Sequence, residues 1–273
     1  MKNNMSTPYC WAITLLGALA LPVQLSAQNP AAADGHNHHP RYRFIDLGTF
    51  GGHHSEVDGG SVVINSHGTV VGGADAADPC PYFPSAPISP AFKWENGVMT
   101  ELPRLPGGCG AFPVAINDHG VIVGVADNGI IDPFTGAPEI HAVVWQDGRI
   151  LDLGTFGGPN SLAAGVNGRG QVTRIAQNAV SDPFNFGDII GLPNSTQWRG
   201  FLWQDGVMQD LGTLGGPDAA ASGFLGLNDR GQVLGISFTN NIVNPGTGFP
   251  TLDSFLWNRG EKLDLGIRHS RVS

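Results

Sequence analysis

The chain has 273 residues, of which 14% are charged, and its net charge is −9 at neutral pH. This acidity argues against nucleic acids and anionic membranes as partners, because both repel negative charge. The 40 glycines and 20 prolines would be typical of disorder if they were scattered. They recur at fixed offsets instead, which indicates turns between regular elements.

Residues 1–27 have the features of a secretory signal. Lys2 gives a positive start, Trp11–Leu21 form an apolar run too short to span a bilayer, and Leu25–Ala27 end in a small residue. We predict cleavage after Ala27 and a secreted protein, extracellular or periplasmic. No later segment is long and apolar enough to predict a transmembrane span.

Residues 28–40 are predicted to form a flexible arm. His36, His38 and His39 could bind a transition-metal ion, but nothing in this segment would hold a ligand geometry. We therefore interpret them as a polar tail.

Residues 41–273 form a predicted repeat domain in which Trp recurs at positions 94, 145, 203 and 257. Each repeat has four strand-like runs, here named strands a to d, separated by turn residues. In one repeat they are Ala142–Trp145, Ile150–Leu153, a run ending at Val166–Asn167, and Gln171–Arg174. Strand a ends in Trp, strand b carries an acid, and strand c ends in Asn. Tight turns with Asn-Gly or Asp-Gly join a to b.

This pattern predicts an all-β fold, a β-propeller-like array of four-stranded antiparallel blades with about four to five repeats. A parallel β-helix fits less well because its coils are shorter and lack tight Asp-Gly hairpins. The first copy lacks strand a and starts with strand b at Phe44–Leu47. Ser254–Trp257 could pair beside that strand and close the array, or the array could stay open.

These motifs resemble the HAF family of extracellular repeat proteins over about residues 44 to 266. Asp210–Gly216 matches the family's Asp-Leu-Gly-Thr-Leu-Gly-Gly box fully. The family's naming triplet has its counterparts at Pro90–Phe92, His141–Val143, Arg199–Phe201 and Asp253–Phe255. The resemblance implies a secreted or surface-exposed protein and no known activity. The chain departs from the pattern at Arg174, which replaces a Gly, and after Gly266, where the Gly-Gly box is missing.

One acid per repeat lies on strand b, and one Asn per repeat ends strand c. The acids are Asp46, Glu101, Asp152, Asp210 and Asp264, and the asparagines are Asn65, Asn117, Asn167 and Asn228. A ring of carboxylates could bind Ca²⁺. We favour structural hydrogen bonding for both sets, because a structural role explains periodicity and a single site does not. The Trp residues are expected to pack between blades.

No catalytic residue, metal site or cofactor is predicted. His53, His54 and His67 fit no metal-ligand spacing, and we interpret them as solvated loop residues. Two function classes remain. The first is a monomeric, non-catalytic module that binds an extracellular glycan or protein through its long d-to-a connections. The second is a propeller enzyme that acts on an extracellular polysaccharide with carboxylates on the same connections.

Cys80 and Cys109 are the two cysteines that follow the signal. Cys80 lies in a d-to-a connection and Cys109 in the next b-to-c connection. In an up-and-down meander both connections emerge at the same end of the array, so we predict a Cys80–Cys109 disulfide.

Overall fold

The computed structural model describes residues 42–57, 62–192, 195–222 and 226–266. The predicted signal with its cleavage site at Ala27, the arm and the three histidines of the arm lie outside these residues. The chain divides into two units, Met1–Asp46 and Leu47–Ser273, and the strands belong to the second unit.

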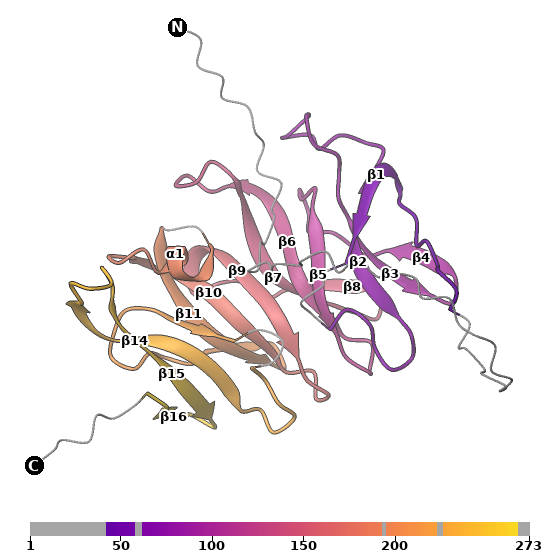
Figure 1. The fold of residues 1–273 in the computed structure, drawn as a ribbon. Coiled ribbons are helices and arrows are strands. Elements are labelled where there is room, and N and C mark those ends of the chain that lie inside the picture. The colour runs from indigo at the N-terminus through magenta and orange to yellow at the C-terminus, as the bar shows by residue number, and fades with distance from the viewer. Residues whose placement is uncertain (1–41, 58–61, 193–194, 223–225, 267–273) are drawn as a thin grey trace, which may run out of the picture. The chain divides into compact units, whose positions relative to one another are not determined.

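The described strands form four antiparallel sheets of four strands each, which confirms the predicted all-β, propeller-like fold (Figure 1). The first sheet contains β1 (Gly51–Glu56), β2 (Val70–Ala76), β3 (Ala91–Glu95) and β4 (Val98–Glu101). The second contains β5 (Ala111–Ile116), β6 (Ile122–Ile131), β7 (Pro138–Gln146) and β8 (Arg149–Asp152). The third contains β9 (Gly157–Val166), β10 (Val172–Ser181), β11 (Thr196–Gln204) and β12 (Val207–Asp210). The fourth contains β13 (Ala219–Ala221), β14 (Val233–Val243), β15 (Pro250–Asn258) and β16 (Glu261–Asp264).

Each sheet runs in the order c, d, a, b, so a blade begins at strand c and not at strand a. The long d-to-a connections therefore join neighbouring strands of one sheet, and the Gly-rich b-to-c connections lead from one sheet to the next. In the connection between β8 and β9, Gly154 and Gly157 have φ angles of 73° and 102°. Such angles suit glycine, and they redirect the chain where the sheet ends.

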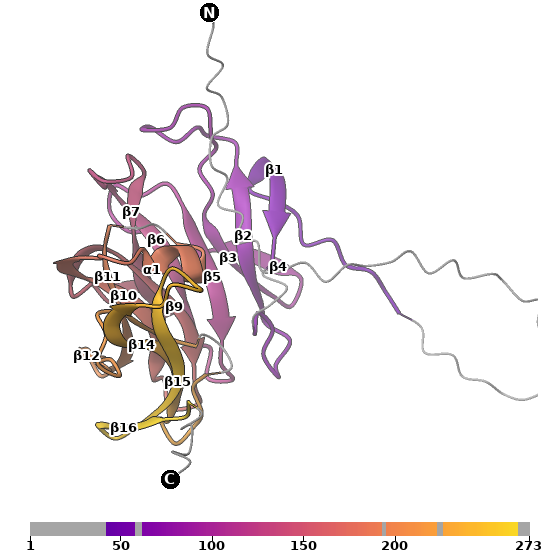
Figure 2. The ribbon, with the colours of Figure 1, turned by 60° about the vertical axis from the view of Figure 1, so that its left-hand side comes forward.

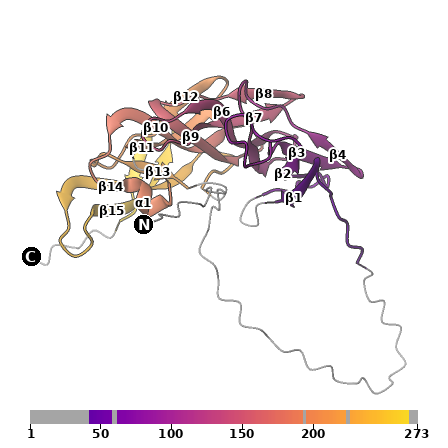
Figure 3. The ribbon, with the colours of Figure 1, turned by 90° about the horizontal axis from the view of Figure 1, so that it is seen from above.

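Apolar clusters fill the space between consecutive sheets. Trp145 on β7 packs with Val71 and Ala91 of the first sheet, and its indole nitrogen donates to the carbonyl of Pro103 at 2.7 Å. Trp203 packs against the cluster between the second and third sheets, and Trp257 lies in the cluster between the third and fourth. The expected packing between blades is confirmed for these three tryptophans. Seen from above, the second and third sheets lie between the first and fourth (Figure 3).

The prediction that Phe44–Leu47 forms a strand is wrong. These residues have no strand assignment, and the Phe44 side chain is 93% exposed. In the complete repeats strand b pairs with the strand a that precedes it, and this copy has no such strand. Of the two alternatives for Ser254–Trp257, pairing beside Phe44–Leu47 is not formed, because β15 pairs with β14 on one edge and β16 on the other.

A short helix, α1 (Phe186–Ile190), lies in the connection between β10 and β11 (Figure 2). Its Phe186 side chain is fully buried and meets the Phe238 ring edge-on, with the ring centres 5.1 Å apart. This contact packs α1, which belongs to a connection of the third sheet, against β14 of the fourth sheet. In the described part of the chain, no helix has the length and apolar character needed to cross a membrane.

Candidate functional site

The c-to-d and a-to-b turns emerge at the same end of every sheet, because the strands alternate in direction. We call this end the turn face. It consists of the c-to-d turns at residues 65–69, 117–121, 167–171 and 228–232, and the a-to-b turns at residues 95–98, 146–149, 204–207 and 258–261. The long d-to-a connections lie at the opposite end.

The strand c asparagines form a ladder across the turn face. The Asn65 amide donates to the Asn117 carbonyl at 3.3 Å, Asn117 to Asn167 at 2.8 Å, and Asn167 to Asn228 at 2.9 Å. The Oδ1 atom of each asparagine also accepts from two backbone amides of its own turn; for Asn167 these are the amides of Arg169 and Gln171, both at 3.0 Å. The predicted structural role of these residues is confirmed, and the ladder holds neighbouring turns at a fixed spacing.

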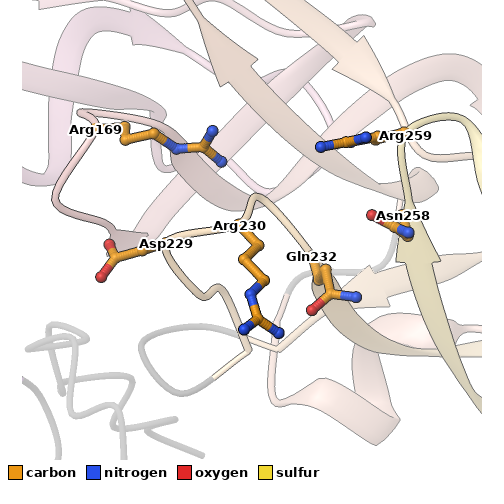
Figure 4. Close-up of a pocket in the computed structure, with 6 residues that line it drawn as sticks. All are labelled: Arg169, Asp229, Arg230, Gln232, Asn258 and Arg259. Carbon is orange, nitrogen blue, oxygen red and sulfur yellow. The ribbon is translucent and has the colours of Figure 1, made fainter.

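A pocket of about 290 Å³ lies on the turn face between the third and fourth sheets. Three arginines contribute to it, Arg169 from one c-to-d turn, Arg230 from the next, and Arg259 from the last a-to-b turn. Asp229, Gln232 and Asn258 complete the lining. In Figure 4 the guanidinium groups of Arg169 and Arg259 point toward one another across the pocket.

The charge of this pocket is opposite to that of the whole chain. Its single carboxylate, Asp229, already accepts a hydrogen bond from the Gly168 amide at 2.8 Å. Three guanidinium groups thus line the pocket together with one partly satisfied acid, on a protein of net charge −9. The pocket is therefore suited to a negatively charged ligand.

A second pocket, of about 220 Å³, lies on the turn face between the first and second sheets. His67 and His119 take the places of Arg169 and Arg230, and the Asp118 carboxylate accepts from the Ser66 amide at 2.8 Å. That hydrogen bond lowers the pKa of Asp118 below its ordinary value. Here Lys93 is paired with Glu95 at 3.1 Å, so the second pocket has no excess of fixed positive charge.

The strand b acids anchor the connections that follow them. Asp152, Asp210 and Asp264 accept from the backbone amides of Gly154, Gly212 and Gly266 at 2.8, 2.7 and 2.8 Å. The predicted structural role is confirmed for these three. Glu101 differs, because its carboxylate lies 3.4 Å from the Arg104 guanidinium. Two of these acids also pair with a side chain of the neighbouring strand. Asp152 lies 2.8 Å from His141 on β7, and Asp210 lies 3.1 Å from Arg199 on β11.

Cys80 and Cys109 form the predicted disulfide, with their Cα atoms 5.6 Å apart. It ties the connection between β2 and β3 to the link that leads into the second sheet. Asp127 on β6 reinforces this link by accepting from the amides of Cys109 and Gly110 and from the Tyr82 hydroxyl. Burial and the Asp127 carboxylate raise the pKa of Tyr82 well above its ordinary value, so the hydroxyl remains a donor.

A carboxyl pair lies at the opposite end from the turn face. Asp218 is fully buried, and its Oδ1 atom accepts from the Trp198 amide at 2.8 Å. Its Oδ2 atom has no donor among the described residues, and Asp182 is its acidic neighbour. Burial and the Asp182 charge raise the pKa of Asp218 to about 7. Neither acid lines either of the two pockets on the turn face.

Sequence reasoning missed the arginine pocket. The signal was present, because each c-to-d turn carries a cationic or titratable residue before its Gly, namely His67, His119, Arg169 and Arg230. The structure places His54 on β1, 3.3 Å from Glu56, and His67 on the turn face. No three His, Cys, Asp or Glu side chains gather into a metal-binding group in the part of the chain that the structure describes.

Comparisons with family models, with curated proteins and with solved structures found no match to this chain.

Proposed function

We propose that this protein is a secreted or surface-exposed, non-catalytic binding module whose ligand occupies the turn face. The observation that carries the proposal is the arginine pocket. The pocket brings three arginines together at one interface of a repeated structure. The turns that carry two of them are held by the asparagine ladder. A rigid framework that varies only a few side chains is typical of a binding surface.

Export is supported by the signal-like N-terminus and by the disulfide. Stable disulfides form in oxidising compartments, and a bridge between Cys80 and Cys109 would not persist in a reducing cytosol. The resemblance of the repeats to an extracellular family points to the same compartment.

The location of the pockets changes the proposed binding surface. Sequence reasoning assigned binding to the long d-to-a connections, whereas both described pockets are built by the short turns at the other end. Short turns held by side-chain hydrogen bonds lose little conformational entropy when a ligand binds. Their binding therefore costs less free energy than binding by a flexible loop.

A propeller enzyme that acts on an extracellular polysaccharide is the alternative. Asp182 and Asp218 are the observation that favours it, because two acids with a shared environment and a raised pKa resemble a catalytic pair. Against it, Asp218 is fully buried, whereas hydrolysis of a glycosidic bond needs both carboxyls to reach the sugar.

A glycan array and a hydrolysis screen on one preparation of the secreted protein separate the two functions. Retention of a ligand with no release of reducing sugar is expected. Hydrolysis that disappears in Asp218→Asn would instead establish the enzyme and overturn the binding module.

A further inference from the structure

We propose that the pocket of Arg169, Arg230 and Arg259 binds an oxyanion group, a carboxylate, sulfate or phosphate, carried by the ligand of the turn face. This inference deepens the proposed function and rests on it. It assigns the chemistry that the ligand must present and the three side chains that recognise it.

The first argument is the balance of charge. Two of the guanidiniums, those of Arg169 and Arg259, point toward one another across the pocket (Figure 4), and its lining contains one acid, Asp229. The Asp229 carboxylate already accepts a hydrogen bond from the Gly168 amide. Like charges held in this way repel, and an anion placed between them converts that repulsion into attraction. The planar guanidinium fork matches the geometry of carboxylate and phosphate oxygens.

The second argument is that Arg169 is held in place before a ligand arrives. Its Nη2 atom donates to Gln171 Oε1 at 2.9 Å, and Gln171 is in turn fixed by Gln204 at 2.7 Å. The guanidinium lies over Gly231 of the next turn, where an added Cβ would come within 3.0 Å of Nη2. A side chain at position 231 would therefore crowd both Arg169 and Gln171, whose Oε1 atom would lie 2.9 Å away.

The third argument is the backbone at Arg259. This residue has a φ angle of 52°, in the left-handed region. The equivalent positions of the other three a-to-b turns are Asn96, Asp147 and Asp205, with φ angles of 52°, 52° and 50°. Asn and Asp adopt this conformation readily, whereas an arginine is disfavoured there. The last turn thus places a long cation where the fold prefers a short polar residue.

The fourth argument is the contrast with the second pocket, which is also built on two consecutive c-to-d turns but takes its strand a residues, Lys93 and Glu95, from the first sheet of its pair. There the Glu95 carboxylate pairs with Lys93, and histidines replace the two turn arginines. The hydrogen bond from Lys93, with that cation's charge, lowers the pKa of Glu95, so the acid stays ionised beside its partner. Because positive charge is in excess in the arginine pocket and not in the second pocket, the repeat itself does not account for the arginines.

The amides of Gln232 and Asn258 also line the arginine pocket. Such groups can donate to and accept from hydroxyls beside an anionic group. An acidic sugar presents both features, and a free phosphate presents the anion alone. The shared chemistry is the oxyanion, and the test distinguishes its sources.

The test is isothermal titration calorimetry of the secreted protein with three probes: a uronic-acid oligosaccharide, a sulfated oligosaccharide and inorganic phosphate. Wild type is compared with Arg259→Asn and Arg230→Gln. Arg259→Asn restores the residue type of the first a-to-b turn, so it should fold at least as well as wild type. Lys93→Gln, in the second pocket, removes one positive charge elsewhere and is the matched control.

We expect at least one probe to bind and to weaken as salt is raised. Each arginine variant should reduce its affinity about 10-fold or more, since a hydrogen bond to a charged group contributes on that scale. The control should bind like wild type. Binding of an acidic oligosaccharide with no binding of phosphate identifies a sugar acid or sulfate, and binding of phosphate alone identifies a phosphate ligand.

Two results would overturn the inference. One is the absence of binding for all three probes, and the other is an equal loss of affinity in the control and the arginine variants. If neutral glycans bind on the array in either case, the proposed binding function survives without the oxyanion site. If nothing binds on the array either, both proposals fail together.

Discussion

Asp218 presents its carboxyl to Asp182 at the place where Asn160 presents an amide to Asp132 one interface earlier. The two side chains share one contact to the backbone. Asn160 Oδ1 accepts from the Ile140 amide at 3.0 Å, as Asp218 Oδ1 accepts from the Trp198 amide at 2.8 Å. The Asn160 amide lies 3.4 Å from Asp132 Oδ2, within reach of a weak hydrogen bond. The last interface thus has two acids where the preceding one has a donor and an acceptor.

Stability should therefore fall as the pH rises from about 4 to about 7. The Asp218 pKa is raised from 3.8 to about 7, so between these values the folded protein holds a proton that the unfolded chain releases. Asp218→Asn should remove this slope and stabilise the protein by about 1–3 kcal/mol at pH 8, by supplying a donor to Asp182. Urea denaturation at pH 5 and pH 8 measures both effects.

The matched control for this prediction is Asn160→Asp, which places a second acid beside Asp132. It should introduce a new loss of stability with rising pH. If Asp218→Asn and wild type show the same pH dependence, the two carboxyls do not share a proton in the folded state.

Lys262→Met should stabilise the protein by about 1 kcal/mol near neutral pH, within the range for burying a polar group without a partner. The Lys262 Nζ atom is buried, has no hydrogen-bond partner among the described residues and lies 4.2 Å from the Phe255 ring centre. Met208 occupies the equivalent position of the preceding repeat. Thermal unfolding checks the prediction, and an unchanged or lower melting temperature would show that the contact with Phe255 outweighs the burial.

The lowered pKa of Lys262 predicts a second pH dependence of the stability. Burial, and then the charge of Arg199, lower the Lys262 pKa from 10.5 to about 8, while Asp210 opposes them. Between pH 8 and 10.5 the unfolded chain binds the proton that the folded protein has lost, so stability should rise with pH across this window. Denaturation at pH 7.5 and pH 10 tests this, and the rise should be absent in Lys262→Met.

Asn167→Ala should lower the free energy of unfolding by about 2–4 kcal/mol, because it leaves several buried polar groups without partners. Asn167 is 5% exposed and bonds two amides of its own turn as well as the Asn228 carbonyl. Asn228→Ala is the control, since Asn228 is exposed at the end of the ladder and should lose less. Equal losses in the two variants, measured by urea denaturation, would contradict a cooperative ladder.

Replacing Cys80 and Cys109 together by Ser should destabilise the protein by roughly 3–4 kcal/mol, from the entropy of the unfolded loop. The two cysteines are 29 residues apart. Non-reducing peptide mapping of the folded protein should recover the bridged peptides, and two free thiols on folded material would refute the bridge. Wild type unfolded with and without reductant gives an independent measure of the same energy.

The periodic sequence determined the fold class, the strands of the complete repeats, the tight turns and the structural roles of the asparagines and strand b acids. It could do so because hydrophobic alternation and Asn-Gly or Asp-Gly turns act over a few residues, and repetition multiplies the signal. The disulfide also followed from the sequence, since strand alternation alone places Cys80 and Cys109 at the same end.

The tertiary structure decided where each sheet begins, whether Phe44–Leu47 pairs, and which side chains meet across an interface. A strand can pair only with a strand that has a free edge. The local sequence of Phe44–Leu47 cannot show that β14 and β16 already occupy both edges of β15. Arg169 and Arg259 are far apart in the chain and come from different types of turn. Only the packing of the third sheet against the fourth makes their charges a single pocket, because electrostatic interaction depends on distance in space and not on position in the sequence.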